Sequence, residues 1–268
     1  MSRPKFSIIT VAFNSGKTIE RTIKSVLNQT FNDYEYIIVD GLSTDNTIDI
    51  IKQYESQFEG RLKWISEKDT GIYNAMNKGI NMSSGWVVGI VNSDDWLDSN
   101  ALANVFTAVQ LRSYDKDALY CGNLIFHYSN GKEQLRVASL KRLEKYIKSY
   151  DIGIFHPATF VTRSVYETVG LFDESIRLNA DVDFIIRCYK DNKRFIFVPH
   201  VLSNMSDGGA TNSGNTAKEL YDRKMVLKKH CSSRFEYYYL YALYYTKKKI
   251  KKLMPHSIIA GIQKISDK

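Results

Sequence analysis

Residues 86–97 read W-V-V-G-I-V-N-S-D-D-W-L: a short apolar run stops at Asn92 and Ser93, and two adjacent acids, Asp94 and Asp95, follow. An apolar run of this length between polar residues is typical of a strand buried on both faces of a sheet. Open α/β sheets bind ligands at the carboxyl ends of such strands. Neighbouring carboxylates repel each other unless a cation lies between them, and Mg²⁺ or Mn²⁺ prefers oxygen ligands. The stretch predicts either a metal site for a phosphate-bearing ligand or a turn whose acids only cap the next helix.

Three more apolar runs precede the acid pair, at 6–11, 34–39 and 62–66, and residues with helical spacing follow each of them. This alternation predicts a parallel sheet with right-handed crossovers. The second run ends at Asp40, which either binds a ligand or only buttresses the turn after the strand. The third leads to Asp69, for which we expect a functional role.

The second half of the chain has a different pattern. A strand over 118–128 enters the turn Ser129-Asn130-Gly131, which predicts a hairpin and therefore a mixed sheet. A further strand is expected over 195–198. Asp181 and Asp183 come just ahead of a predicted helix, where an acid either caps the helix or, in the case of Asp181, acts as a general base.

Two basic side chains are weaker candidates for contact with a donor or an acceptor. Lys78 lies on the predicted helix over 72–80 and either reaches a phosphate or sugar or is a solvated surface residue. His156 precedes a proline and either faces the cleft or is structural.

The net charge of +8 belongs to the C-terminal region. Residues 211–268 hold 13 Lys and Arg against 4 Asp and Glu, whereas the first 210 residues hold 24 against 25.

The three widely spaced cysteines form no CxxC pair and favour a reducing, cytoplasmic environment. The strand-like run within the first ten residues leaves no room for a signal peptide, and no apolar stretch approaches the ~18 residues of a membrane span.

The motifs come in a recognisable order: F-S-I-I-T-V-A-F-N, then Y-I-I-V-D-G-L-S-T-D-N-T, V-N-S-D-D-W-L, H-P-A-T-F, G-L-F-D-E and A-D-V-D-F. Over roughly residues 4–210 this order resembles family 2 glycosyltransferases of the GT-A fold, most closely the bacterial branch that assembles surface polysaccharides. The resemblance implies an α/β fold with a mostly parallel central sheet flanked by helices. The expected organisation is a GT-A domain over 1–210 and a helical C-terminal region over 211–268.

The resemblance also implies a role for each matching residue. Asp40 would hydrogen-bond the base, usually uracil, Asp69 would lie near the nucleoside, and Asp181 would be the catalytic base. Two departures from the family pattern are Asn92, where an Asp is frequent, and Ala180, where Glu often precedes the base. The remaining nucleotide-binding positions are Val11, Phe13, Asn14, Asn92, Ser93 and Asp94, and the metal ligands are Asp94 and Asp95.

The reaction that fits these residues is inverting transfer of a sugar from a UDP-sugar to a saccharide acceptor, with Mg²⁺ or Mn²⁺ as cofactor. The metal would stabilise the leaving diphosphate, and one carboxylate would deprotonate the acceptor. Hydrolysis by a carboxylate pair leaves the Asp40 loop unexplained. A nucleotidyltransferase and a non-catalytic nucleotide-sugar-binding partner remain as alternatives, the latter because of Asn92.

The C-terminal region holds six tyrosines between Tyr237 and Tyr245 and five lysines between Lys247 and Lys252. Tyrosine favours the membrane–water interface, and clustered lysines are attracted to anionic lipid. We expect a helix on the inner face of the cell membrane, so that the protein is cytoplasmic and peripheral and its acceptor is lipid-linked. Packing of this helix on the main domain or on a second subunit is the alternative. Nucleic-acid binding also suits such a composition but is not expected.

Overall fold

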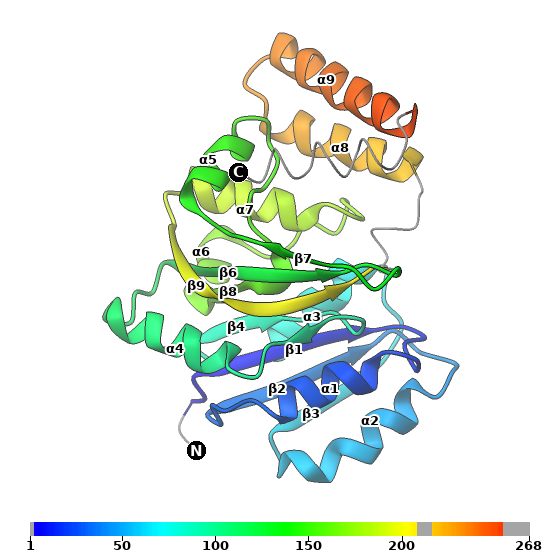
Figure 1. The fold of residues 1–268 in the computed structure, drawn as a ribbon, viewed down its shortest axis with the longest axis vertical. Coiled ribbons are helices and arrows are strands. Elements are labelled where there is room, and N and C mark those ends of the chain that lie inside the picture. Colours follow the sequence, from blue (N-terminus) through cyan, green and yellow to red (C-terminus); the bar gives the residue numbers. More distant parts are fainter. Residues whose placement is uncertain (1–2, 208–215, 254–268) are drawn as a thin grey trace.

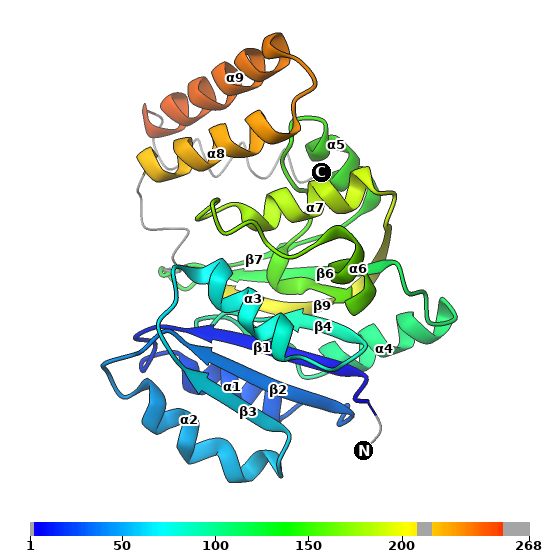
Figure 2. The same ribbon diagram turned by 180° about the vertical axis from the view of Figure 1, so that it is seen from behind.

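The structure, a computed structural model, describes residues 3–207 and 216–253. The nine strands within these ranges form one sheet in the order β3-β2-β1-β4-β8-β6-β9-β5, with β7 paired to β6. Helices cover both faces of the sheet (Figures 1 and 2). The strands are β1 (Phe6–Ala12), β2 (Tyr34–Asp40), β3 (Leu62–Ser66), β4 (Val87–Ile90), β5 (Trp96–Leu97), β6 (Ala118–His127), β7 (Glu133–Arg136), β8 (Thr159–Thr162) and β9 (Arg194–Ser206).

Strands β3, β2, β1 and β4 are parallel neighbours, which confirms the predicted arrangement of the first half of the chain. Helices connect them: α1 (Ile19–Leu27), then α2 (Thr47–Glu55) with the short 3₁₀ helix η1 (Ser56–Phe58), and then α3 (Ile72–Met82). Because these strands point the same way, the segments that follow them leave the sheet at one edge. We call this edge the carboxyl edge.

The second half of the sheet is mixed, as the predicted hairpin requires. β8 lies antiparallel between β4 and β6, and β6 pairs antiparallel with β7. β9 is parallel to β6 and antiparallel to β5. The sheet is therefore less parallel than the sequence predicts. The helices of this half are α4 (Ala101–Leu111), α5 (Leu140–Ile147), η2 (His156–Ala158), α6 (Arg163–Val169) and α7 (Ala180–Lys190).

Apolar side chains fill both faces of the inner strands. On β1, Phe6 and Ile8 join the core under α1, α2 and α4, whereas Ile9 and Val11 join the core under α3, α5, α6 and α7. Each buried Å² of apolar surface stabilises the fold by roughly 25 cal/mol. Packing on both faces fixes the positions of the strand ends that carry the polar residues.

The last strand is longer than predicted. The expected strand over 195–198 is β9, which continues through Pro199 to Ser206. Proline cannot donate to a sheet ladder, and the strand steps over it: Val198 is opposite Gly122, and Val201 is opposite the next residue of β6. This bulge allows the proline inside a long strand, which the sequence pattern alone does not indicate.

The predicted start of the helix after Asn179 is also corrected. α7 begins at Ala180, so Asp181 and Asp183 lie in its first turn rather than ahead of it. Both residues are therefore close to the positive end of the helix dipole.

A buried glutamate ties the strands together at the edge opposite to the carboxyl edge. Glu35 on β2 accepts hydrogen bonds from Ser7 Oγ on β1 (2.6 Å), from Ser84 Oγ (2.8 Å) and from Gly85 N (3.1 Å) before β4, and it pairs with Lys63 on β3 (2.9 Å). Burial acts to raise the pKa of Glu35, but the bonds from Ser7, Lys63 and Ser84 outweigh it and lower the pKa to about 2. One carboxylate thus joins all four parallel strands.

The predicted helical C-terminal region consists of α8 (Thr216–His230) and α9 (Arg234–Leu253), and its parts at 211–215 and 254–268 lie outside the described residues. α8 is attached to the main body: the buried Arg223 donates to the carbonyls of Ser149 and Tyr150, and Asp222 accepts from Leu178 N. α9 packs on α8 at the end of the molecule farthest from α2 (Figures 1 and 2). Within the described ranges, no helix is long and apolar enough to cross a bilayer.

Candidate active site

The acids predicted to form the site lie at the carboxyl edge. Asp40 ends β2, Asp69 follows β3, and Asp94 and Asp95 follow β4. Tyr73, near the start of α3, also follows β3 and so lies at this edge. Because these strands are parallel neighbours, their carboxyl ends form a single rim, which is where open α/β sheets bind ligands.

Asp40 is fully buried and holds the turn that follows it. Its Oδ2 accepts hydrogen bonds from Ser43 N (2.9 Å) and Ser66 Oγ (2.7 Å), and its Oδ1 accepts from Ser43 Oγ. The carboxylate therefore shapes the loop over 41–44, and its contact with a nucleotide base stays a prediction.

Phe13, Gly41 and Asp69 come together beside this turn. A Cβ on Gly41 would lie 2.4 Å from Asp69 Oδ2 and 3.4 Å from the Phe13 ring, so only glycine allows the carboxylate to approach the backbone this closely. The Phe13 ring is exposed, whereas Val11 is buried in the core beneath α3. Two of the residues predicted on the nucleotide side are thus adjacent in space.

Hydrogen bonds connect the loops after β1, β2 and β4. Asn14, which has a left-handed φ of 49°, accepts from Thr44 N through Oδ1 (2.8 Å). Ser15 Oγ lies 2.7 Å from Ser93 Oγ. The loop carrying Asn14 is therefore held between the Asp40 turn and the acid pair, so that the three predicted segments form one surface.

The two adjacent acids have different surroundings. Asp95 is 1% exposed, accepts from Asn92 Nδ2 (3.3 Å) and Ser206 N (3.3 Å), and has its pKa raised to about 8 by burial and by the Asp94 charge. Asp94 is only partly buried, and burial raises its pKa as well. Arg21 donates to the Asp94 backbone carbonyl (2.7 Å), and its guanidinium lies over the ring of Trp96. In the part of the chain that the structure describes, no Lys, Arg or His side chain bonds to the Asp95 carboxylate.

This turn has the chemistry of a site completed by a cation and a phosphate. Asn92 Oδ1 is buried and has no hydrogen-bond partner among the described residues, so it is an acceptor oxygen beside two carboxylates. No group of three or more His, Cys, Asp or Glu suited to a metal occurs in the described ranges. Mg²⁺ is commonly held by one or two carboxylates together with substrate phosphates, and Asp94 and Asp95 fit that ligand set.

Asp181 is held by a buried tyrosine. Tyr73 Oη donates to Asp181 Oδ1 over 2.9 Å, and burial together with the Asp181 charge keeps the pKa of Tyr73 well above its usual range. Tyr73 therefore remains a hydrogen-bond donor at any working pH. This bond fixes the position of the Asp181 carboxylate, and its role as a base stays a prediction.

His156 and Lys78 have neighbours that bear on their predicted roles. Burial lowers the pKa of His156, while the Asp181 charge acts in the opposite direction, and the imidazole packs edge-on against Phe172 (5.7 Å). Lys78 pairs with Glu67 (2.8 Å) and donates to the Lys68 carbonyl (2.8 Å), so it fixes the loop before Asp69. Their contact with a donor or acceptor stays a prediction.

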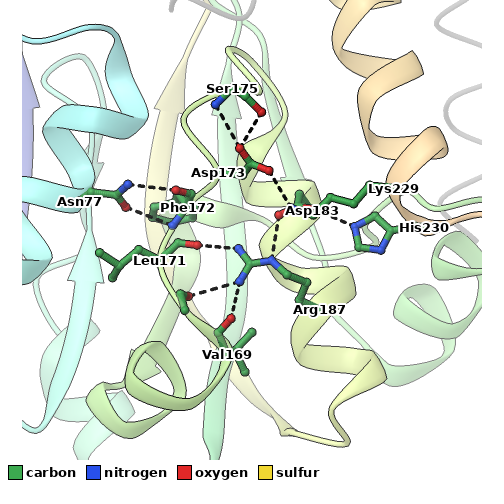
Figure 3. A network of polar contacts seen from close by, with 11 residues as sticks. Asn77, Val169, Leu171, Phe172, Asp173, Ser175, Asp183, Arg187, Lys229 and His230 are labelled. Carbon is green, nitrogen blue, oxygen red and sulfur yellow. Dashed lines mark hydrogen bonds and ion pairs between the residues drawn. The ribbon is translucent and has the colours of Figure 1, made fainter.

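The sequence did not single out the ionic cluster around Asp183 (Figure 3). This fully buried carboxylate accepts from Arg187 Nε (2.8 Å), His230 Nε2 (2.8 Å) and Lys229 Nζ (3.0 Å). Burial acts to raise the pKa of Asp183, but the bonds from His230 and Lys229 and the Arg187 charge hold it well below its usual range. The i,i+4 spacing of Asp183 and Arg187 was the available signal.

The same cluster fixes the segment between α6 and α7. Arg187 donates to the carbonyls of Val169 (2.7 Å) and Leu171 (2.6 Å), and Phe172 exchanges two hydrogen bonds of 3.0 Å with Asn77 on α3 (Figure 3). Asp181 is thus held from both sides, through α7 and through α3.

Comparison with known proteins identifies the family. Residues 7–170 match the model for "Glycosyl transferase family 2", which is more than half of the chain. The chain belongs to this family. A PGL/p-HBAD biosynthesis glycosyltransferase of Mycobacterium bovis is 30% identical over 216 residues, covering 80% of this chain and 81% of the relative. A chondroitin synthase of Escherichia coli is 32% identical over 197 residues, covering 69% of this chain and 26% of the synthase.

Solved glycosyltransferases share the fold. S. aureus TarS 1–349 in complex with UDP-GlcNAc has a TM-score of 0.64 at 17% identity, covering 88% of this chain and 69% of TarS. The mannosyltransferase PcManGT from Pyrobaculum calidifontis, in complex with GDP-Man and Mn²⁺, has a TM-score of 0.63 at 18% identity, covering 90% of this chain and 69% of that one. The protein is therefore a family 2 glycosyltransferase with a GT-A fold, as its motifs indicate.

Proposed function

We propose that this glycosyltransferase moves a sugar from a UDP-sugar to a saccharide acceptor, with inversion and with a divalent metal. The observation that carries the proposal is the hydrogen bond from Tyr73 to Asp181, which presents a carboxylate at the rim where Asp94 and Asp95 also lie. The complexes of TarS with UDP-GlcNAc and of PcManGT with Mn²⁺ support a nucleotide-sugar donor and a metal.

In this mechanism the loops after β1, β2 and β3 bind the nucleoside, with Phe13, Asn14 and Asp69 nearest to it. Asp94 and Asp95 would hold Mg²⁺ or Mn²⁺, which would supply positive charge that stabilises the departing diphosphate. Asp181 takes the proton from the acceptor hydroxyl as its oxygen attacks the anomeric carbon. The bond from that carbon to the diphosphate breaks on the opposite face, so the anomeric configuration inverts.

Release of free UDP from a panel of UDP-sugars, measured with Mn²⁺ or after EDTA treatment, tests the donor and the metal. Release of pyrophosphate instead would favour a nucleotidyltransferase, and UDP binding without turnover would favour a non-catalytic partner. Asp181→Asn should abolish transfer and leave UDP binding intact, because it removes the base without touching the donor loops. Full activity of this variant would refute the assignment of the base.

We also propose that the protein works at the inner face of the cell membrane on a lipid-linked acceptor of surface polysaccharide synthesis. Leu240 is buried against the body of the protein, while the opposite face of α9 exposes Phe235 (81%), Tyr238 (66%) and Tyr239. The sequence of α9 is also rich in lysine, so the helix combines interfacial aromatic rings with positive charge. The relative named for PGL/p-HBAD biosynthesis supports a biosynthetic role of this kind.

Flotation with vesicles tests the membrane proposal. The wild-type protein should float with phosphatidylglycerol vesicles and less with phosphatidylcholine vesicles, and the combined Phe235→Ser, Tyr238→Ser and Tyr239→Ser variant should lose this binding. Leu111→Ser is the matched control, because Leu111 is 78% exposed on α4. Undiminished binding of the triple variant would refute a role for this face of α9.

A further inference from the structure

A hollow lies between α8 and the segment that precedes α7. It is a groove of about 490 Å³ between the segment 174–177 and the first turns of α8. Its volume is within the range of about 300–1,000 Å³ typical of small-molecule sites. The groove is lined by Glu174, Ser175, Arg177, Ala217, Lys218, Tyr221 and Asp222.

Hydrogen bonds to neighbouring elements fix both walls of the groove. Asn74 and Asn77 of α3 each donate to the Glu174 carboxylate over 2.9 Å. On the other wall, Asp222 is buried and accepts from Leu178 N, which joins α8 to the segment that forms the first wall. Glu174 and Asp222 are therefore held in place before a ligand binds, which lowers the entropy cost of binding.

Hydrogen bonds of neighbouring residues link the walls of the groove to the segment that carries the proposed base. Leu178, which bonds to one wall, precedes Asp181 by three residues. On α3, Tyr73 bonds to Asp181, and the next residue, Asn74, bonds to Glu174 on the other wall. The groove and Asp181 therefore share the same supporting elements, α3 and the segment that leads into α7.

The lining has the chemistry of a carbohydrate site. The Tyr221 ring is 56% exposed and offers a flat apolar face on which the C–H face of a pyranose can stack. Carboxylates and cations, including Glu174 and Arg177, line the same groove and are hydrogen-bonding partners for sugar hydroxyls, whereas few apolar side chains line it to receive a lipid tail. The nucleoside side of the site lies elsewhere, beside Phe13 and Asp69.

We propose that this groove binds the saccharide part of the acceptor, with Tyr221 as its stacking platform. This inference rests on the proposed glycosyl transfer. It goes further by assigning a binding site to the acceptor. One wall of the groove is α8, on which α9 packs, so an acceptor anchored at α9 would have its saccharide part near this groove.

Chemical modification of the intact protein tests the groove without knowledge of the natural acceptor. Nitration of tyrosines by tetranitromethane is followed at Tyr221 and at Tyr238, which is also exposed and lies on α9. The probes are methyl glucoside, methyl galactoside, methyl N-acetylglucosaminide, cellobiose and lactose. At least one of these saccharides should slow nitration of Tyr221 about threefold. A ligand at twice its Kd occupies about two thirds of the sites, and only the remaining third can react. Nitration of Tyr238 should not change.

Unchanged nitration of Tyr221 with every saccharide, or equal slowing at both tyrosines, would overturn the proposal. A kinetic comparison adds a second readout once transfer is measured: Tyr221→Ala should raise the KM for the acceptor about tenfold, the loss of about one stacking contact. Leu111→Ala, at an exposed position of α4 away from both surfaces, is the control. UDP binding and UDP release to water should be the same in both variants, so that failure of the groove is distinct from failure of glycosyl transfer itself.

Discussion

Replacement of Glu35 by glutamine should make the protein less sensitive to acid, although it lowers stability at neutral pH. The pKa of Glu35 falls from its usual 4.5 to about 2 on folding, and such a difference corresponds to about 3 kcal/mol. Because the pKa is lowered in the folded state, this stabilisation is complete above pH 4.5 and is lost as the pH falls toward 2. Glutamine keeps the shape of the side chain but does not titrate.

The assay is urea unfolding followed by circular dichroism at several pH values between 7 and 2.5. Between pH 7 and pH 2.5, the free energy of unfolding should drop by about 2.5 kcal/mol more in the wild type than in Glu35→Gln, because the other carboxyls are common to both. Glu55→Gln, at the exposed end of α2, is the control and should follow the wild type. Parallel pH curves for wild type and Glu35→Gln would refute the reasoning that one carboxylate holds the four strands.

Three further variants probe the site. Asp183→Asn should lower the free energy of unfolding by about 3–5 kcal/mol in urea titrations, because it breaks a buried ionic cluster, whereas Asp191→Asn at the exposed end of α7 should cost under ~1 kcal/mol. Gly41→Ala should weaken UDP binding measured by calorimetry, since a Cβ there collides with the neighbouring carboxylate, and unchanged affinity would refute the packing argument. Tyr73→Phe should reduce kcat about tenfold or more at constant UDP affinity, because one bond to a charged group is lost; a change in affinity alone would assign Tyr73 to the donor site instead.

The rim of the site was predictable because its geometry follows from strand direction. Each apolar run ends at a polar residue, and parallel neighbours bring those ends together, so Asp40, Asp69 and the Asp94–Asp95 pair had to share an edge once the strands were parallel. The sequence did not indicate that Asp95 would be buried and Asp94 partly exposed. This difference depends on contacts with Ser206, which lies on a strand far away in the sequence.

Contacts between residues far apart in the sequence were missed for the same reason. His230 meets Asp183 across 47 residues, and no local pattern in either segment indicates this pair. The bulge at Pro199 also depends on its partner strand β6, because a proline in isolation predicts the end of a strand. Local sequence patterns predict where helices and strands form, whereas the contact between α7 and α8 depends on the tertiary fold.

The cluster around Asp183 has a consequence for the order in which the protein matures. During synthesis, α7 with Asp181 leaves the ribosome about forty residues before Lys229 and His230 of α8. Before α8 is made, Asp183 lacks the hydrogen bonds from Lys229 and His230 that balance its buried charge. α8 would therefore complete this ionic cluster, and in a nascent chain the first turn of α7 would lack part of its support until α8 has been made.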